Sequence, residues 1–100
     1  MRALIAIAIA LAACGSSKPA KPEIDATRAI ETLRSYADRC AACNNDKDCV
    51  RLIRDEYDPY KRSLWKSREA YAPADQTAFD GHFNRFAMCG DAAGLTIWKH

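Results

Sequence analysis

The stretch CAACNNDKDC, residues 40–49, decides how the rest of the chain folds. Its centre, residues 44–48, consists of Asn, Asp and Lys. Asn and Asp favour turns, because their side chains bond to the nearby backbone and tolerate left-handed angles. Asp46 or Asp48 can also cap a helix that follows the turn. The stretch therefore predicts that one helix ends near Cys43 and that a second begins near Cys49.

The residues before this turn have the pattern of an amphipathic helix over 23–43. Apolar residues recur there at spacings of three and four, which places them on one face of a helix. They are Ala26, Ile30, Leu33, Ala37 and Cys40. Arg39 lies late in the segment, where a positive charge interacts favourably with the helix dipole.

A second helical pattern extends from Cys49 to Tyr71 and includes a proline. Its apolar positions are Cys49, Val50, Ile53, Tyr57, Tyr60, Leu64 and Tyr71. Pro59 removes a backbone hydrogen bond, which costs about 3 kcal/mol in a helix interior. Because Tyr57, Tyr60 and Leu64 keep the same phase across it, we expect one continuous, kinked helix. A new helix capped by Asp58 is the alternative.

The segment 72–75 predicts a break before a third helix, whose core face contains Phe79, Phe83 and Phe86. Gly90 and Gly94 are candidate ends of this helix. The tail, residues 95–100, is apolar and short, and we expect it to lie as a strap over the helices. The predicted fold is therefore all-α: a helical hairpin stapled by disulfides, with a third helix packed across it, in one domain over residues 23–100.

Four cysteines belong to this domain, and a small domain buries too little surface to be stable without such cross-links. Cys40 lies within the apolar face of the first helix, so it is placed to meet Cys89 beside the phenylalanines of the third. Cys43 lies beside the turn and is placed to reach Cys49. We predict Cys40–Cys89 and Cys43–Cys49. The second choice is Cys40–Cys49 with Cys43–Cys89.

The spacing Cys40-x-x-Cys43 also has three chemical interpretations. Covalent haem attachment needs a histidine after the second cysteine, where Asn44 stands. A redox pair works at a helix N-terminus, whereas these cysteines fall at a predicted C-terminus. A structural zinc site usually combines two close pairs, and Cys49 and Cys89 are far apart. A thiol-redox or metal-binding protein that uses these four cysteines remains the alternative function.

The N-terminus has the pattern of a secretory signal: a basic start, an apolar run from Ala3 to Ala13, and small residues before Cys14. The run is too short to span a bilayer as a helix. We expect cleavage after Ala13, so that residues 1–13 are a signal peptide. Residues 14–22, rich in Gly, Ser and Pro, then form a linker. A plain signal peptide that leaves Cys14 unmodified is the alternative.

The sequence Leu11-Ala12-Ala13-Cys14 resembles the lipobox of bacterial lipoprotein precursors. The resemblance implies that Cys14 is acylated and becomes the mature N-terminus, anchored in the membrane by its lipid. It also implies the outer membrane, because Gly15 stands where this family has an aspartate that retains proteins in the inner membrane. The span from Ala29 to Cys89 is similar, more loosely, to small envelope lipoproteins that contain cysteines.

The net charge and the absence of catalytic motifs exclude further classes of function. The formal charge is +2, and it includes Arg2 of the signal. The mature chain is thus nearly neutral, which argues against nucleic acid as a partner. The chain has no Gly-x-Ser-x-Gly motif and no glycine-rich phosphate loop. We predict neither an enzyme nor a bound cofactor or metal, and expect a binding or structural module.

One cluster is a candidate for binding an envelope protein or an anionic surface. Its members are Lys61, Arg62, Trp65, Lys66 and Arg68. A basic helix face with an exposed tryptophan can meet anionic lipid or glycan, because an indole ring suits the boundary between apolar and wet regions. The alternative is an ordinary solvated face beside a half-buried Trp65.

Overall fold

The structure is a computed structural model that describes residues 21–100. These residues form four α-helices and no strand: α2 (Ala26–Ala42), α3 (Lys47–Tyr57), α4 (Lys61–Arg68) and α5 (Pro73–Ala92). The predicted all-α class is confirmed. The structure has four helices where three were expected, because the second predicted helix is divided into α3 and α4. The signal peptide, Cys14 and all but the end of the linker lie outside the described residues. No helix within 21–100 is long and apolar enough to cross a membrane.

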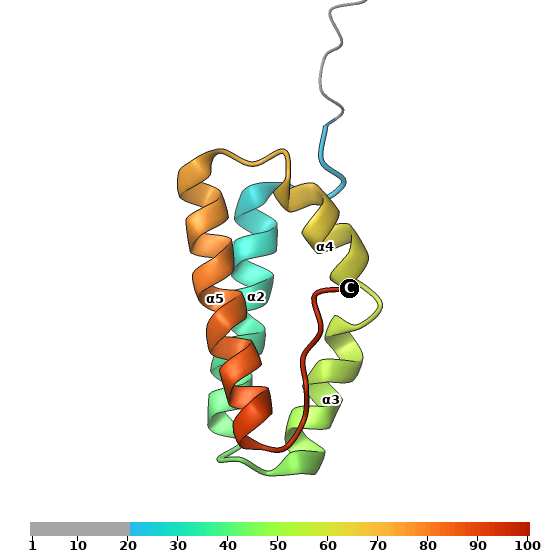
Figure 1. Cartoon of the computed structure of the whole chain (residues 1–100), viewed down its shortest axis with the longest axis vertical. Helices are drawn as coiled ribbons and strands as arrows, with labels where there is room; N and C mark the ends of the chain where they lie inside the picture. The colour runs from blue at the N-terminus through green and yellow to red at the C-terminus, as the bar shows by residue number, and fades with distance from the viewer. Residues whose placement is uncertain (1–20) are drawn as a thin grey trace, which may run out of the picture.

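Helices α2 and α5 lie side by side and run in the same direction, and they form the largest contact between any two helices (Figure 1). The chain returns between them through α3 and α4, which run the opposite way. After α5 the chain turns back, and residues 94–100 run between α5 and the α3–α4 pair. These last residues are the expected strap.

The turn between α2 and α3 forms as its chemistry predicts. Asn44 and Asn45 adopt left-handed φ angles of 52° and 63°. The Asp46 carboxylate accepts hydrogen bonds from the backbone N–H groups of Asp48 and Cys49, at 3.0 and 3.3 Å, and so caps α3. Asp25 caps α2 in the same way, accepting from the Arg28 N–H at 2.9 Å. Both helix starts are thus encoded locally.

The expected continuous helix across Pro59 is wrong. Helix α3 ends at Tyr57, a turn follows, and α4 begins at Lys61 without a side-chain cap. Within the turn the Tyr60 N–H donates to the Tyr57 carbonyl at 2.9 Å. This hydrogen bond joins residues three apart, as in a tight turn, and not four apart as in an α-helix. Proline has no N–H to continue the helical ladder, so the interruption is complete rather than a kink. Tyr60, expected in the core, is 57% exposed as a result.

Aromatic rings fill the core between the helices. Tyr57, Phe79 and Phe86 are fully buried, and Tyr36 and Phe83 are nearly so. Tyr57 contacts Tyr36, Phe83 and Phe86 with ring centroids 5.4–6.0 Å apart. On α2 the buried face is Ala29, Leu33, Tyr36, Ala37 and Cys40, whereas the expected Ala26 and Ile30 are only partly buried. The core face is therefore rotated slightly from the predicted one.

The strap is seated on the last turn of α5. Leu95 and Ile97 are buried, and the Leu95 N–H donates to the Gly90 carbonyl at 2.8 Å. A Cβ atom at Gly90 would lie 2.6 Å from the Ile97 side chain, so only glycine allows this close approach. Gly94 reverses the chain direction with a φ of +82°, which glycine adopts readily.

Two disulfides join the helices where α2 and α5 end. Cys40 of α2 is bonded to Cys89 of α5, with Cα atoms 6.2 Å apart. Cys43, at the end of α2, is bonded to Cys49 in the first turn of α3, with Cα atoms 5.6 Å apart. This is the predicted pairing, and the second choice does not form. The phase of the helical pattern was enough to choose between them.

Candidate functional site

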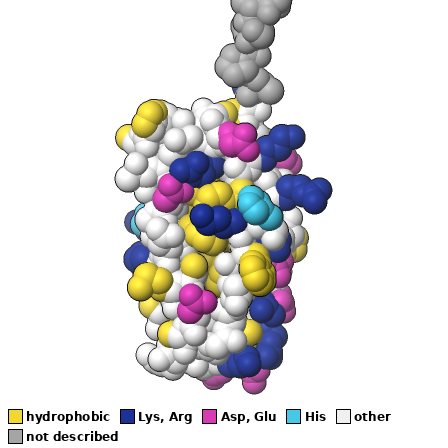
Figure 2. Space-filling view, viewed as in Figure 1, with side chains coloured by type: hydrophobic (Ala, Val, Ile, Leu, Met, Phe, Trp, Pro, Cys, Tyr) yellow, Lys and Arg dark blue, Asp and Glu magenta, His cyan; other side chains and the backbone are white. Residues whose placement is uncertain are grey.

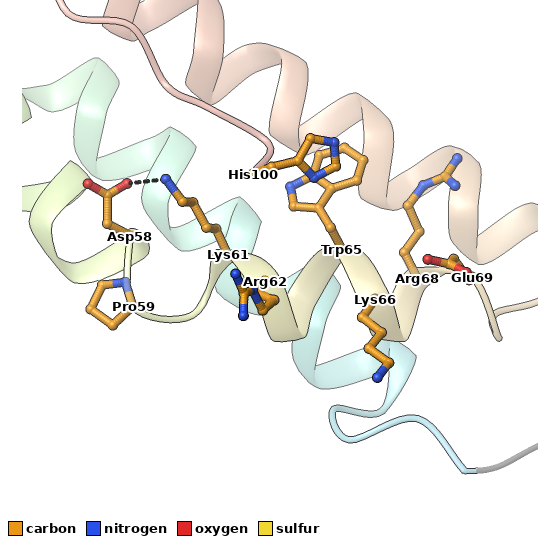
Figure 3. A pocket seen from close by; sticks show the side chains of 9 residues that line it. All are labelled: Asp58, Pro59, Lys61, Arg62, Trp65, Lys66, Arg68, Glu69 and His100. Atoms are coloured by element: carbon orange, nitrogen blue, oxygen red, sulfur yellow. Dashed lines mark ion pairs between the residues drawn. The ribbon is translucent and has the colours of Figure 1, made fainter.

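The candidate site is a groove of about 650 Å³ along α4. It is lined by Asp58, Pro59, Lys61, Arg62, Trp65, Lys66, Arg68, Glu69 and His100. All five residues of the predicted basic cluster are among them. Figure 3 shows that α4 supplies most of these side chains, while His100 reaches the groove from the strap.

Trp65 forms the floor of the groove, but it is half-buried rather than exposed. Its ring makes edge-on contacts with Phe79 and Phe83, each with centroids 4.9 Å apart. Its Nε1–H donates to the Tyr57 hydroxyl at 3.1 Å, and that hydroxyl donates to the Trp98 carbonyl. The alternative interpretation of the cluster, a half-buried Trp65, is therefore the one that the structure confirms. Trp65 mainly holds α4 against α5 and, through Tyr57, against the strap.

Burial also changes the pKa of Tyr57, the central member of this chain of hydrogen bonds. It raises the pKa of Tyr57 to about 12, because the charged phenolate would lose its hydration in the core. The hydrogen bond that Trp65 donates lowers this pKa but does not outweigh burial. Tyr57 therefore keeps its proton, and the bond to the strap, at any physiological pH.

Two cations lie near the Trp65 ring. The Lys99 Nζ is 5.1 Å from the ring centroid, and the Arg68 guanidinium carbon is 5.9 Å from it. Both distances lie within the range of cation–π attraction. Lys99 belongs to the strap, so this attraction adds a contact between the strap and α4.

The basic cluster divides into two groups on α4. Lys61 and Arg68 have acidic partners: Lys61 lies 3.6 Å from Asp58, and Arg68 forms two hydrogen bonds with Asp80 at 2.6 and 2.7 Å. Arg62 and Lys66 are exposed, and neither forms an ion pair with any described residue. They lie four residues apart, on the same face of the helix. The positive charge available on α4 is therefore that of Arg62 and Lys66, and Lys99 of the strap, which forms no ion pair within residues 21–100, adds a third cation beside the Trp65 ring.

The segment that enters the domain is fixed to the same helix. The Ile24 N–H donates to the Ser67 hydroxyl of α4 at 3.1 Å, and the Tyr71 hydroxyl donates to the Ile24 carbonyl. A second hollow lies between the entering chain and α4, lined by Lys21, Pro22, Glu23, Lys66, Ser67, Glu69 and Ala70. Lys66 lines both hollows. Helical periodicity does not predict this contact, and its one signal is that Ser67 falls on the buried side of α4.

On the face shown in Figure 2, Lys and Arg side chains surround an apolar patch in the half nearer the entering chain, with a histidine beside it. Acidic side chains lie among them. The groove therefore combines an aromatic floor with both signs of charge at its edge. Such an arrangement can hold a ligand that carries negative charge next to an apolar or ring-shaped part.

The cysteines offer different chemistry, which the structure does not favour. Cys40, Cys43, Cys49 and Cys89 are all in disulfides. Cys40 and Cys43, the candidate redox pair, are bonded to other partners and not to each other. Among residues 21–100 no three His, Cys, Asp or Glu side chains gather closely enough to hold a metal ion.

Comparisons with family models, with curated proteins and with solved structures found no match to this chain.

Proposed function

We propose that this chain is a lipid-anchored protein of the bacterial cell envelope, and that its helical domain is a non-catalytic binding or structural module. The observation that carries the proposal is Leu11-Ala12-Ala13-Cys14 after a basic start and a short apolar run. This order resembles a lipoprotein signal. The mature protein would begin at a lipid-modified Cys14, facing the periplasm or the cell surface, with the outer membrane favoured by Gly15.

The cysteine chemistry of the domain supports an extracytoplasmic location. Disulfides persist in oxidising compartments and are rare in the cytosol. Four of the five cysteines are bonded to one another, which leaves Cys14 without a cysteine of this chain to pair with. A lipid thioether at Cys14 accounts for the fifth.

The groove supports binding rather than catalysis. Its described residues supply cations, carboxylates, an imidazole and an indole ring. Lys61, Arg68 and Trp65 are engaged in ion pairs and core contacts, whereas Arg62 and Lys66 form no ion pair with any described residue. A nucleophile activated by a hydrogen-bonded base is the usual signature of covalent catalysis, and no two of the described lining residues form such a hydrogen-bonded pair.

The anchor is tested by replacing Cys14 with Ser in the full chain expressed in a bacterial host. We expect the unmodified chain to incorporate labelled palmitate, and the Cys14→Ser variant to incorporate none and to lose stable membrane anchoring. Gly15→Asp is the matched control: it keeps the cysteine and its label, and the family pattern predicts a shift from outer to inner membrane. A Cys14→Ser variant that is still labelled would contradict the proposal.

The alternative function, thiol-redox or metal binding, is tested by counting free thiols in the native, membrane-extracted protein. We expect an alkylating reagent to modify none of the four cysteines of the domain before reduction, and all four after reduction and unfolding. Rapid alkylation of Cys40 and Cys43 in the native protein would favour the alternative instead.

A further inference from the structure

We propose that Arg62 and Lys66 of α4 dock the domain onto anionic lipid headgroups of the same membrane that holds its anchor. This inference rests on the proposed lipid anchor and adds to it an orientation and a partner. It starts from a contact described above: the entering chain is bonded through Ile24 to Ser67, in the last turn of α4.

The first step concerns position. The domain is attached to the membrane at the end where α2 begins, because Ile24 and Asp25 immediately precede that helix. Figure 1 shows this end, with the entering chain beside α4. Lys66 lines a common hollow with Lys21, the first described residue. Lys66 therefore lies at the point of attachment, and Arg62 lies one helical turn away from it on α4.

The second step concerns reach. Seven peptide units separate Cys14 from Lys21, and a fully extended chain spans at most about 3.6 Å for each. The point of attachment thus stays within about 25 Å of the membrane surface, even when the linker is fully stretched. A short tether also gives the groove a high effective concentration of headgroups, of millimolar order or more. Weak individual contacts are then enough to hold the domain down.

The third step concerns charge. Residues 15–22 contribute Lys18 and Lys21 and no acid. Of these, Lys21 shares a hollow with Lys66, and Arg62 lies one turn from Lys66 on α4. Basic clusters beside a membrane anchor bind anionic lipids, with about 1 kcal/mol contributed by each Lys or Arg near the surface.

The acidic residues at this end limit the effect but do not reverse it. Asp58 and Asp80 are already paired with Lys61 and Arg68. Glu23 and Glu69 line the hollow between the entering chain and α4. Asp25 and Asp75 lie at the same end, at the starts of α2 and α5, so this end as a whole is close to neutral and the docking depends on the local pair of Arg62 and Lys66 on α4. A membrane rather than a soluble glycan is the partner that the geometry favours, since the tether brings headgroups to this face.

The test uses the full, lipidated chain in vesicles of two compositions, one zwitterionic and one with anionic phosphatidylglycerol added. An amine-reactive reagent, read by mass spectrometry, measures how fast each lysine is modified. We expect Lys66 to be modified several-fold more slowly in anionic vesicles, and the difference to disappear at 1 M salt, where screening acts within about 3 Å. Lys47, at the opposite end of the bundle, is the internal control and should not change.

A matched pair of variants assigns the effect to α4. Arg62→Gln removes one exposed cation beside Lys66 and should weaken docking roughly five-fold, the value expected for one cation near an anionic surface. Arg51→Gln makes the same change in charge on α3, at the other end, and should leave Lys66 protected. Far-ultraviolet circular dichroism should be the same for both variants and the unmodified chain.

The outcomes separate this inference from the proposed function. A chain that floats with both kinds of vesicle, but whose Lys66 is modified equally fast in each, keeps its anchor and overturns the docking. Equal protection of Lys66 in the two variants also overturns it. A chain that floats with neither vesicle contradicts the lipid anchor itself, and the docking falls with it.

Discussion

The two ends of the helical bundle are held together by different means. At the disulfide end, where α2 and α5 finish and α3 begins, two covalent bonds and a capped turn join three helices. At the tether end, where α2 and α5 begin and α4 finishes, the elements are joined by rings and hydrogen bonds. These include the Ser67–Ile24 and Tyr71–Ile24 bonds and the Arg68–Asp80 ion pair.

The difference shows where this small domain can vary. The disulfide end depends on a few cysteines that must keep their helical phase, and its surface makes little contribution to the candidate site. The tether end depends on many weaker contacts, and it carries the exposed cations of α4. The candidate groove thus lies where the helices are joined by weaker contacts, while the two covalent bonds lie at the other end.

Removing the long-range disulfide, Cys40–Cys89, should lower the stability of the domain the most. Cys40 and Cys89 are 49 residues apart, so in the chain-entropy model their bond contributes about 4 kcal/mol. We expect the double variant Cys40→Ala, Cys89→Ala to lose most of its stability in urea unfolding. A loss below about 1 kcal/mol would show that the aromatic core holds the disulfide end without it.

Raising the pH should loosen the aromatic core around Tyr57, which lies between the two ends, and leave the disulfides intact. The folded pKa of Tyr57, about 12, lies above its ordinary value of 10.0. The neutral Tyr57 therefore contributes its full stabilisation to the folded state below pH 10. As the pH rises from 10 toward 12, the free energy of unfolding falls by about 1.4 kcal/mol for each pH unit. Burial also raises the pKa of Tyr36 and Tyr71, which adds to the loss in the same direction.

Urea unfolding at several pH values between 8 and 11.5 checks this expectation, with Tyr57→Phe as the comparison. The variant is less stable at pH 8, because Trp65 and the Trp98 carbonyl lose a partner. Its stability should nevertheless fall less steeply above pH 10. Identical slopes for the two proteins would show that Tyr57 does not titrate as expected.

Removing the short-range disulfide should cost less. Cys43 and Cys49 are six residues apart, and closing so short a loop contributes about 2.4 kcal/mol in the same model. The cap at Asp46 and the left-handed Asn44 and Asn45 hold the turn independently. We expect Cys43→Ala, Cys49→Ala to keep its helical content and to unfold at lower urea. A larger loss than for the Cys40–Cys89 variant would reverse the ranking.

The smallest effect is expected where the entering chain meets α4. Ser67→Ala removes the hydrogen bond to the Ile24 N–H and should cost about 1 kcal/mol. Amide hydrogen exchange at Ile24 should be faster, with the disulfide end unchanged. Ser63→Ala is the control on the same helix, because its hydroxyl makes no side-chain hydrogen bond to the described residues. Faster exchange in both variants would mean that α4 as a whole has loosened.

The sequence was most informative at the disulfide end. Helical phase, turn-forming Asn and Asp, and the spacing of cysteines are local signals, and together they gave the pairing of Cys40 with Cys89. The phase argument failed at Pro59, where Tyr60 appeared to continue the apolar face. Proline can kink or break a helix, and here the helix is broken although the pattern of side chains continues beyond it.

The candidate site was harder to predict, because its form depends on contacts between residues distant in the sequence. The five members of the basic cluster do line one groove. Their helical spacing did not reveal that Asp80 pairs with Arg68, or that Lys99 lies near the Trp65 ring. The contact of Ile24 with Ser67 spans 43 residues and has no periodic signal at all.

The arrangement of the cysteines also sets an order of events during biosynthesis. Chains are made from the N-terminus, so Cys40, Cys43 and Cys49 emerge together before Cys89 exists. Cys43 and Cys49 can reach their native bond at once, but Cys40 competes with them for as long as it waits for its partner. Mispaired intermediates are then corrected only by thiol–disulfide exchange. We therefore expect the Cys40–Cys89 bond, which contributes most to stability, to be the last to form, after any mispaired bond of Cys40 has been exchanged.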